Sequence, residues 1–166
     1  VDLERLYWRN DHSEFWGHLT GRRLYAPDGS VLGLVGIIAD INERKQAEAA
    51  LHESEQHFRT LANSGSALIW TSGLDKGCNY FNTTWLNFTG QSLAHELGNG
   101  WTEGVHPDDF THCLSVYVDH FERRQAFSME YRLRHADGEY RWIRDDGTPR
   151  YDSKGEFIGF IGFCYD

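Results

Sequence analysis

A short cluster of histidines and aspartates is the first place in this sequence where chemistry could occur. The stretch HPDDFTH brings His106, Asp108, Asp109 and His112 within seven residues, and such side chains are common metal ligands. The two histidines, however, do not share one helical face at ligand spacing, and acids directly after Pro107 are typical of a helix N-terminus. We therefore interpret the cluster as structural and expect no metal site.

The cysteines and the charge balance argue against several other functions. Cys78, Cys113 and Cys164 are odd in number and far apart, so they form neither a disulfide framework nor a zinc motif. This usage is typical of a reducing compartment, and the sequence has no signal peptide or membrane-spanning apolar run, so we expect a cytoplasmic location. The net charge of −9, with no basic stripe, argues against nucleic acid and anionic membranes as partners.

The sequence also lacks a nucleophile, a base and an acid in an arrangement that would support a hydrolytic triad. We therefore predict no catalytic residues and a chain that is not itself an enzyme. Because the sequence opens on Val1 instead of Met, we expect it to be a piece of a longer protein, whose attachment to a membrane it leaves open.

Residues 1–40 and 127–166 repeat each other without a gap. Nine of the forty aligned positions are identical, among them Gly36 with Gly162 and Asp40 with Asp166. Each copy has three apolar or alternating segments separated by turns, a pattern that predicts an antiparallel meander of three strands. The repeated glycines do not form a GxGxxG loop, and a glycine within a strand more often marks close approach of the backbone. The first copy therefore predicts the tail of a preceding domain of the same kind.

A helix-forming stretch without glycine or proline, residues 41–62, separates the two copies. Its apolar seam has a 4-3-4-3 spacing and consists of Ala47, Leu51, Ser54, Phe58 and Leu61. The seam is thin, because Ser54 is polar and the pattern spans only about two heptads. Two interpretations stay open: the helix packs on its own domain, or it pairs with the same helix of a second chain. We favour the homodimer, because the helix joins two domain copies.

From residue 63 onward, the predicted order is two strands, several short helices, one longer helix and three strands. This order resembles the PAS domain with a C-terminal PAC segment, as found in bacterial sensors. The residues that carry the resemblance are YFNTTWLNFTG, GNGWTEGVHPDD, FSMEYRLRHADGEYRWIRDDGTPRY and GEFIGFIGFCYD. ADINERK is similar to the family's terminal D-I-T signature, with Asn42 in place of Thr. The resemblance covers residues 58–166 as a nearly complete domain.

The resemblance implies an α+β fold, a five-stranded antiparallel sheet in the order 2-1-5-4-3 with helices on one face. We expect three parts: the last strands of a preceding PAS domain (1–40), a linker helix (41–62) and a PAS domain (63–166). Such domains are sensor, relay or dimerisation modules of receptors such as histidine kinases and cyclic-di-GMP synthases. The signal would leave through the strand-to-helix junctions at Asp40, Ile41 and Asp166. The alternative is a dimerisation scaffold that binds no ligand.

The space between the helices and the sheet is the candidate ligand site. Its expected aromatic lining is Trp70, Trp85, Trp101, Tyr117, Phe121, Tyr131 and Trp142, with Asn79, Arg132 and Arg144 as polar candidates. Two interpretations stay open here as well, a fully packed core and a pocket for a small molecule. The choice of lining residues depends on strand phase, because a slip of one residue turns every inward side chain outward.

We leave the cofactor unassigned. In light-sensing members of the family, a Cys in an N-C-R motif on a short helix binds flavin, and the matching stretch here has no Cys. Haem-binding members use a His of the long helix, whereas His112 and His120 lie off the predicted apolar face of that helix. We therefore expect neither a covalent flavin nor haem.

Overall fold

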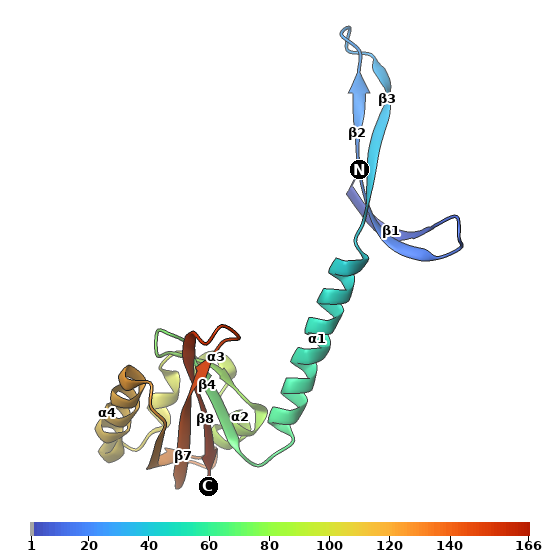
Figure 1. Cartoon of the computed structure of the whole chain (residues 1–166). Helices are drawn as coiled ribbons and strands as arrows, with labels where there is room; N and C mark the ends of the chain where they lie inside the picture. The colour runs from blue at the N-terminus through green and yellow to red at the C-terminus, as the bar shows by residue number, and fades with distance from the viewer. Residues whose placement is uncertain (1) are drawn as a thin grey trace. The chain divides into compact units, whose positions relative to one another are not determined.

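The structure, a computed structural model, describes residues 2–166 and divides the chain into two compact units, Val1–His57 and Phe58–Asp166. The boundary between the units falls within the helix α1 (Asn42–Asn63), which lies between the two repeat copies in the sequence. A three-stranded sheet belongs to the first unit and a five-stranded sheet to the second (Figure 1).

The first unit contains the predicted meander. Its strands are β1 (Asp2–Trp8), β2 (Glu14–Tyr25) and β3 (Val31–Asp40), paired antiparallel in that order. Most apolar side chains of this sheet are exposed, including Leu34 at 75% and Ile37 at 69%. The second unit buries the equivalent meander, so the same strand pattern occurs here in two different environments.

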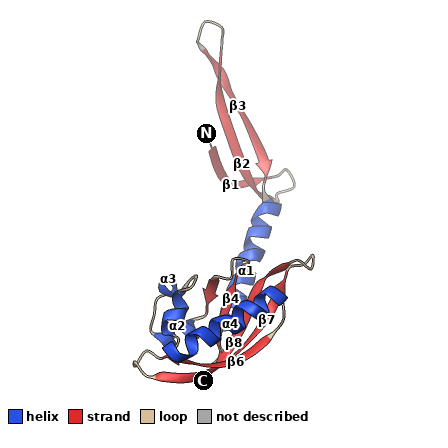
Figure 2. Ribbon diagram, turned by 90° about the vertical axis from the view of Figure 1, so that its left-hand side faces the viewer, coloured by secondary structure: helices blue, strands red, loops and turns tan. Residues whose placement is uncertain are grey.

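The second unit has the α+β architecture that the sequence predicts. Its sheet strands are β4 (Leu68–Ser72), β5 (Cys78–Phe81), β6 (Phe127–Arg134), β7 (Tyr140–Tyr151) and β8 (Phe157–Tyr165). The helices are α2 (Thr83–Thr89), α3 (Leu93–Glu96), the short 3-10 helix η1 (Gly100–Gly104) and α4 (Pro107–Arg123). The strand order β5-β4-β8-β7-β6 confirms the expected order 2-1-5-4-3, and Figure 2 shows the helices on one face of this sheet.

Asn82 fixes the start of the helical layer. Its side-chain oxygen accepts hydrogen bonds from the backbone N–H of Trp85 at 2.9 Å, as an N-cap, and of Ile69 at 3.0 Å. Its side-chain amide donates to the carbonyl oxygens of Ala62 at 2.7 Å and Ala67 at 3.0 Å. Because the residue is buried, satisfying all of these groups is worth more than at the surface. One side chain thereby joins the end of α1, the start of β4 and α2.

Two glycines in the centre of the sheet explain part of the repeated phrase. Gly162 of β8 lies opposite Gly147 of β7, and on either side of this pair are Trp70 of β4 and Phe127 of β6. A Cβ atom at Gly162 would lie 2.1 Å from the indole nitrogen of Trp70, and one at Gly147 would lie 2.3 Å from the ring of Phe127. The missing side chains thus let two aromatic rings lie flat across the sheet.

We predict that Gly162→Ala destabilises the second unit, because the added Cβ overlaps the Trp70 indole, which is part of a packed core. Overpacking of this kind costs about 1–3 kcal/mol. The measurement is the free energy of unfolding in urea. Gly65→Ala is the matched control, since its Cβ would come no closer than 4.0 Å to another atom. Equal stability of the two variants would show that the Trp70 indole tolerates a side chain at position 162.

Candidate functional site

The junction between β3 and α1 is fastened to the neighbouring strand β2. The backbone N–H of Ile41 donates to the Trp16 carbonyl oxygen at 2.9 Å, and the Trp16 N–H donates to Asn42 Oδ1 at 2.9 Å. Asp40 accepts a hydrogen bond from the Asn42 backbone at 3.0 Å and forms an ion pair with Arg9. The Asn that stands in place of Thr in the D-I-T signature therefore makes a structural hydrogen bond to β2.

The basic pair that follows the signature binds the first strand of the same sheet. Arg44 and Lys45 both form ion pairs with Glu4 of β1, and the Lys45 Nζ lies 2.9 Å from a Glu4 oxygen. The Lys45 and Arg44 hydrogen bonds lower the pKa of Glu4. The Lys45 ammonium also lies 5.1 Å from the centre of the Trp16 ring, a cation–π distance. The first turn of α1 is thus joined to β1 and β2.

The equivalent positions of the second copy are exposed. Trp142 corresponds to Trp16, and its side chain is 60% exposed, with the Arg132 guanidinium 5.3 Å from its ring. Asp166 corresponds to Asp40, and one of its oxygens lies 3.7 Å from the Arg141 guanidinium. Trp142 of the second copy thus lies at the surface, whereas its counterpart in the first copy, Trp16, contacts Lys45 of α1.

The assignment of Trp142 to the pocket is wrong, because the strand phase differs by one residue from the expectation. The inward residues of β7 are Ile143 and Asp145, both buried, and Trp142 lies on the opposite face.

The three polar residues expected at the pocket bind other side chains instead. Arg132 binds Asp109, Arg144 pairs with Asp146 at 3.2 Å, and Asn79 is exposed and accepts a hydrogen bond from Thr71.

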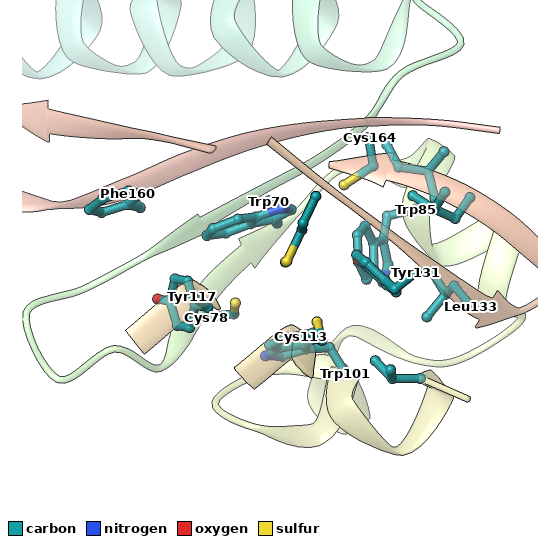
Figure 3. Packing of buried hydrophobic residues seen from close by; sticks show 14 of the residues in the cluster. Trp70, Cys78, Trp85, Trp101, Cys113, Tyr117, Tyr131, Leu133, Phe160 and Cys164 are labelled. Atoms are coloured by element: carbon teal, nitrogen blue, oxygen red, sulfur yellow. The ribbon is translucent and has the colours of Figure 1, made fainter. Parts of the chain in front are cut away.

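A small cavity lies between the helices and the sheet of the second unit. It has a volume of about 10 Å³, room for about one water molecule. Its lining consists of Trp70, Cys78, Phe81, Trp85, Trp101, Tyr117, Met129, Tyr131 and Asp145. Figure 3 shows six of these side chains between the sheet and the helical layer, namely Trp70, Cys78, Trp85, Trp101, Tyr117 and Tyr131. Five of the seven aromatic residues expected at the pocket line this cavity.

The predicted lining residue Phe121 is buried, but it is not among the residues that line the cavity. Its ring stacks on Phe160 with the ring centres 5.3 Å apart, so it fills the core beside the cavity. Four further lining residues, Cys78, Phe81, Met129 and Asp145, were not expected from the sequence. The alternating burial of β6 and β7 could have identified Met129 and Asp145 if the strand phase had been known.

Asp145 is the one carboxyl group in the lining, and only 2% of the residue is exposed. Burial raises its pKa to about 7, because desolvation disfavours the charged carboxylate. The Trp70 indole N–H and the Cys164 thiol act in the opposite direction and lower the pKa. The Trp70 nitrogen lies 3.1 and 3.2 Å from the two carboxyl oxygens.

Two hydrogen-bond donors in the same lining lack an oxygen or nitrogen partner among the described residues. They are the indole nitrogen of Trp85 and the hydroxyl of Tyr131, and both residues are 1% exposed. The Tyr131 hydroxyl interacts with the Cys164 thiol, whose pKa it lowers. Unpaired buried donors are uncommon in proteins and carry a desolvation penalty. The cavity therefore combines a buried acid with one donor that has no partner, the Trp85 indole, and one that meets only a thiol, the Tyr131 hydroxyl.

The thiols in this region are poor nucleophiles. Burial raises the pKa of Cys113 to about 12, and it also raises the pKa values of Cys78 and Cys164. The thiolate is the reactive form, so these three side chains are inert at neutral pH. Among residues 2–166, no group of three or more His, Cys, Asp or Glu side chains is placed to hold a metal ion.

The HPDDFTH cluster instead stabilises the start of α4. His106 caps the helix by accepting from the Asp108 backbone N–H at 3.2 Å. Asp109 accepts from Arg132 of β6 three times, from its backbone N–H at 3.0 Å and from two guanidinium nitrogens at 2.8 Å. These hydrogen bonds lower the pKa of Asp109 to about 2. The cluster joins the long helix to the sheet.

The seam of α1 is exposed along its length. Leu51 is 62% exposed, Leu61 60% and Phe58 47%, and Ala47 and Ser54 are exposed as well. Phe58 lies beside Tyr80 of the second unit, with ring centres 5.6 Å apart. Ala62 is the one buried residue of the helix. Within the second unit, the last turns of α1 thus pack through Phe58 and Ala62.

Comparison with known protein families gives a clear result. A family model described as the PAS fold matches residues 79–164, and a second model, described as a PAS domain, matches residues 1–43. The first match covers just over half of the chain, so the chain belongs to the PAS family. This confirms the expectation from the sequence motifs, and it makes the second unit a sensory domain of signal transduction.

Several relatives and solved structures are similar to this chain. The uncharacterized protein y4lL of Sinorhizobium fredii is 40% identical over 141 residues, which cover 85% of this chain and 17% of that protein. The peroxide stress-activated histidine kinase mak1 of Schizosaccharomyces pombe is 30% identical over 128 residues, which cover 69% of this chain and 8% of the kinase. This chain thus spans less than a fifth of the length of either relative.

Among solved structures, the N-terminal domain of a diguanylate cyclase with a PAS/PAC sensor from Marinobacter aquaeolei has a TM-score of 0.54 and 26% identity. The match covers 60% of this chain and 94% of that domain. Within residues 2–166, no helix is both long and apolar enough to span a membrane.

Proposed function

We propose that this chain is a dimerising sensor and relay module of a multidomain signalling receptor. In this proposal, changes in the cavity of a PAS core alter the last strand of its sheet, and the following helix carries the change onward. The observation that carries the proposal is the junction at Asp40, where β3 continues into α1 and the first helical turn is bound to β1 and β2.

The contacts of the junction favour transmission. Glu4 binds the helix from β1, and the Trp16 backbone binds it from β2, so three strands meet the helix start. A helix held at several points follows the strands as one body when the sheet distorts, and packed elements amplify small shifts of this kind. Asp166 ends the equivalent strand of the second unit and would act in the same way.

The exposed seam supports pairing with a second copy of the chain. Leu51, Phe58 and Leu61 lie on one stripe of α1 and leave much of their apolar surface in water. Burial of such surface against an identical helix is favourable, and the 4-3-4-3 spacing of the whole seam matches the geometry of a two-stranded coiled coil. Parallel pairing would place two junctions side by side, so that a change in one domain alters the helix pair.

A scaffold that binds no metabolite is the second candidate. The cavity volume of about 10 Å³ favours it, because a molecule larger than water enters only if the core opens. The names of the relatives suggest a histidine kinase or a diguanylate cyclase as the parent protein, and the buried free thiols suit a cytoplasmic location.

We predict that Leu51→Glu shifts the chain from dimer to monomer, because a charge on the seam opposes burial of the helix face. Ala49→Glu is the matched control: it adds the same charge to the same helix, away from the seam. The measurement is molar mass in sedimentation equilibrium over a range of protein concentrations. Equal dimer fractions for both variants would contradict pairing through this seam.

We predict that Glu4→Gln loosens the junction, because it removes the negative charge that pairs with Arg44 and Lys45 and leaves one acceptor oxygen where there were two. Backbone hydrogen exchange in the first turns of α1 should become several-fold faster, while exchange in α4 stays unchanged. Glu14→Gln changes the same charge at the start of β2 and serves as the control. Exchange in α1 that is unaffected by Glu4→Gln would remove the support for the relay.

A further inference from the structure

We propose that the cavity of the second unit is a proton-binding site, in which Asp145 takes up or releases a proton and the surrounding donors rearrange in response. This inference rests on the proposed sensory function and names the ligand of that site as a proton. It starts from the geometry of one buried carboxyl group and of the side chains that face it.

Asp145 lies on the inward face of β7, between β8 and the edge strand β6. Its partner on β8 is Cys164, and its partner on β6 is Met129. From β4, the Trp70 indole reaches it diagonally and donates to both carboxyl oxygens. The carboxyl group is therefore enclosed by residues of three other strands of the sheet, β4, β6 and β8, and the helices cover it.

Among the residues that the structure describes, no cation is one of the groups that shift the pKa of Asp145. Six titratable side chains interact electrostatically with Asp145. They are Cys78 of β5, Cys113 and Tyr117 of α4, Tyr131 of β6, Cys164 of β8 and Asp146 of β7 itself. The thiols and phenols are neutral at physiological pH, and Asp146 is itself an acid. An ionised Asp145 thus depends on hydrogen bonds, whereas a protonated one does not.

The Trp85 indole, which has no partner, and the Tyr131 hydroxyl, which has only the Cys164 thiol, fit the ionised form of the cavity. Trp85 of α2 and Tyr131 of β6 line the same cavity and have polar hydrogens to donate. Two donors from different layers can approach an ionised carboxylate, or bind it through a single water molecule in the small cavity. When the carboxyl group is protonated, this attraction weakens and the donors are released. The proton thus selects between two arrangements of sheet and helices.

The site is connected to the proposed output strand. Trp70, which binds Asp145, lies directly over Gly162 of β8, and Cys164 of β8 lowers the pKa of Asp145. Both β8 positions come shortly before the strand ends at Tyr165. A movement of the indole or of the carboxyl group therefore acts on the strand that precedes Asp166.

The test is a pH titration of the full chain, followed by the indole N–H resonances of Trp70 and Trp85 in ¹⁵N NMR spectra. Between about pH 5 and pH 9, we expect both resonances to shift with one shared midpoint near neutrality. Asp145→Asn should abolish that midpoint. Asp146→Asn, which removes the adjacent carboxyl group on the other face of the strand, should retain it. The exposed Trp8 serves as an internal reference for effects of the histidines.

A second variant keeps the test decisive if Asp145→Asn does not fold. Trp70→Phe removes the donor that lowers the pKa of Asp145, so the midpoint seen at Trp85 should move to higher pH. Resonances of Trp70 and Trp85 that do not change with pH, or a midpoint that survives Asp145→Asn, would overturn the proton site. Dimerisation measured on the same samples reports separately on the proposed function, which would stand if a dimer forms without the titration.

Discussion

The Trp70 indole lies flat across Gly162 and donates a hydrogen bond to a carboxyl group that is almost completely removed from water. This arrangement needs a strand without a side chain below the ring and a partner for the indole N–H. It also requires the core to enclose a carboxyl group, and this is favourable only if the group is neutral or well hydrogen-bonded. The aromatic contacts of Trp70 with Tyr117 and Phe127 build the rest of the core around it.

The need for a strand without a side chain below a large ring also explains why the two copies of the repeated strand pattern pack differently. In the first unit, Gly36 lies opposite Gly21, as Gly162 lies opposite Gly147 in the second. The nearest side-chain atom to a Cβ at Gly36 is the end of Leu19, a flexible methyl group, and no indole covers this position. The glycine pair therefore allows large rings to cross the sheet, and in the second unit β4 and β6 supply those rings, Trp70 and Phe127. In the first copy, the outer face carries the contacts to α1 instead.

Much of the fold could be predicted from the sequence, because it depends on local signals. The Asn82 cap, the proline at the start of α4 and the apolar strands each fix one element through nearby residues, and the repeat fixes the order of the last three strands. The candidate site was predicted less well. Trp142 and Asp145 are three residues apart on one strand, and only the pairing with β6 and β8 decides which of them faces the core. Long-range contacts set this phase, and a single sequence does not contain them.

The most direct test of this account is the free energy of unfolding as a function of pH, for the wild type and for Asp145→Asn. Burial raises the pKa of Asp145 from 3.8 to about 7, so between these values the folded protein holds a proton that the unfolded chain releases. Stability from this group is therefore greatest below about pH 4 and declines until about pH 7. The account predicts that the wild type loses a few kcal/mol relative to Asp145→Asn over this interval, since one pKa unit is about 1.4 kcal/mol. A difference that stays constant with pH, or that grows in favour of the wild type as pH rises, would contradict it.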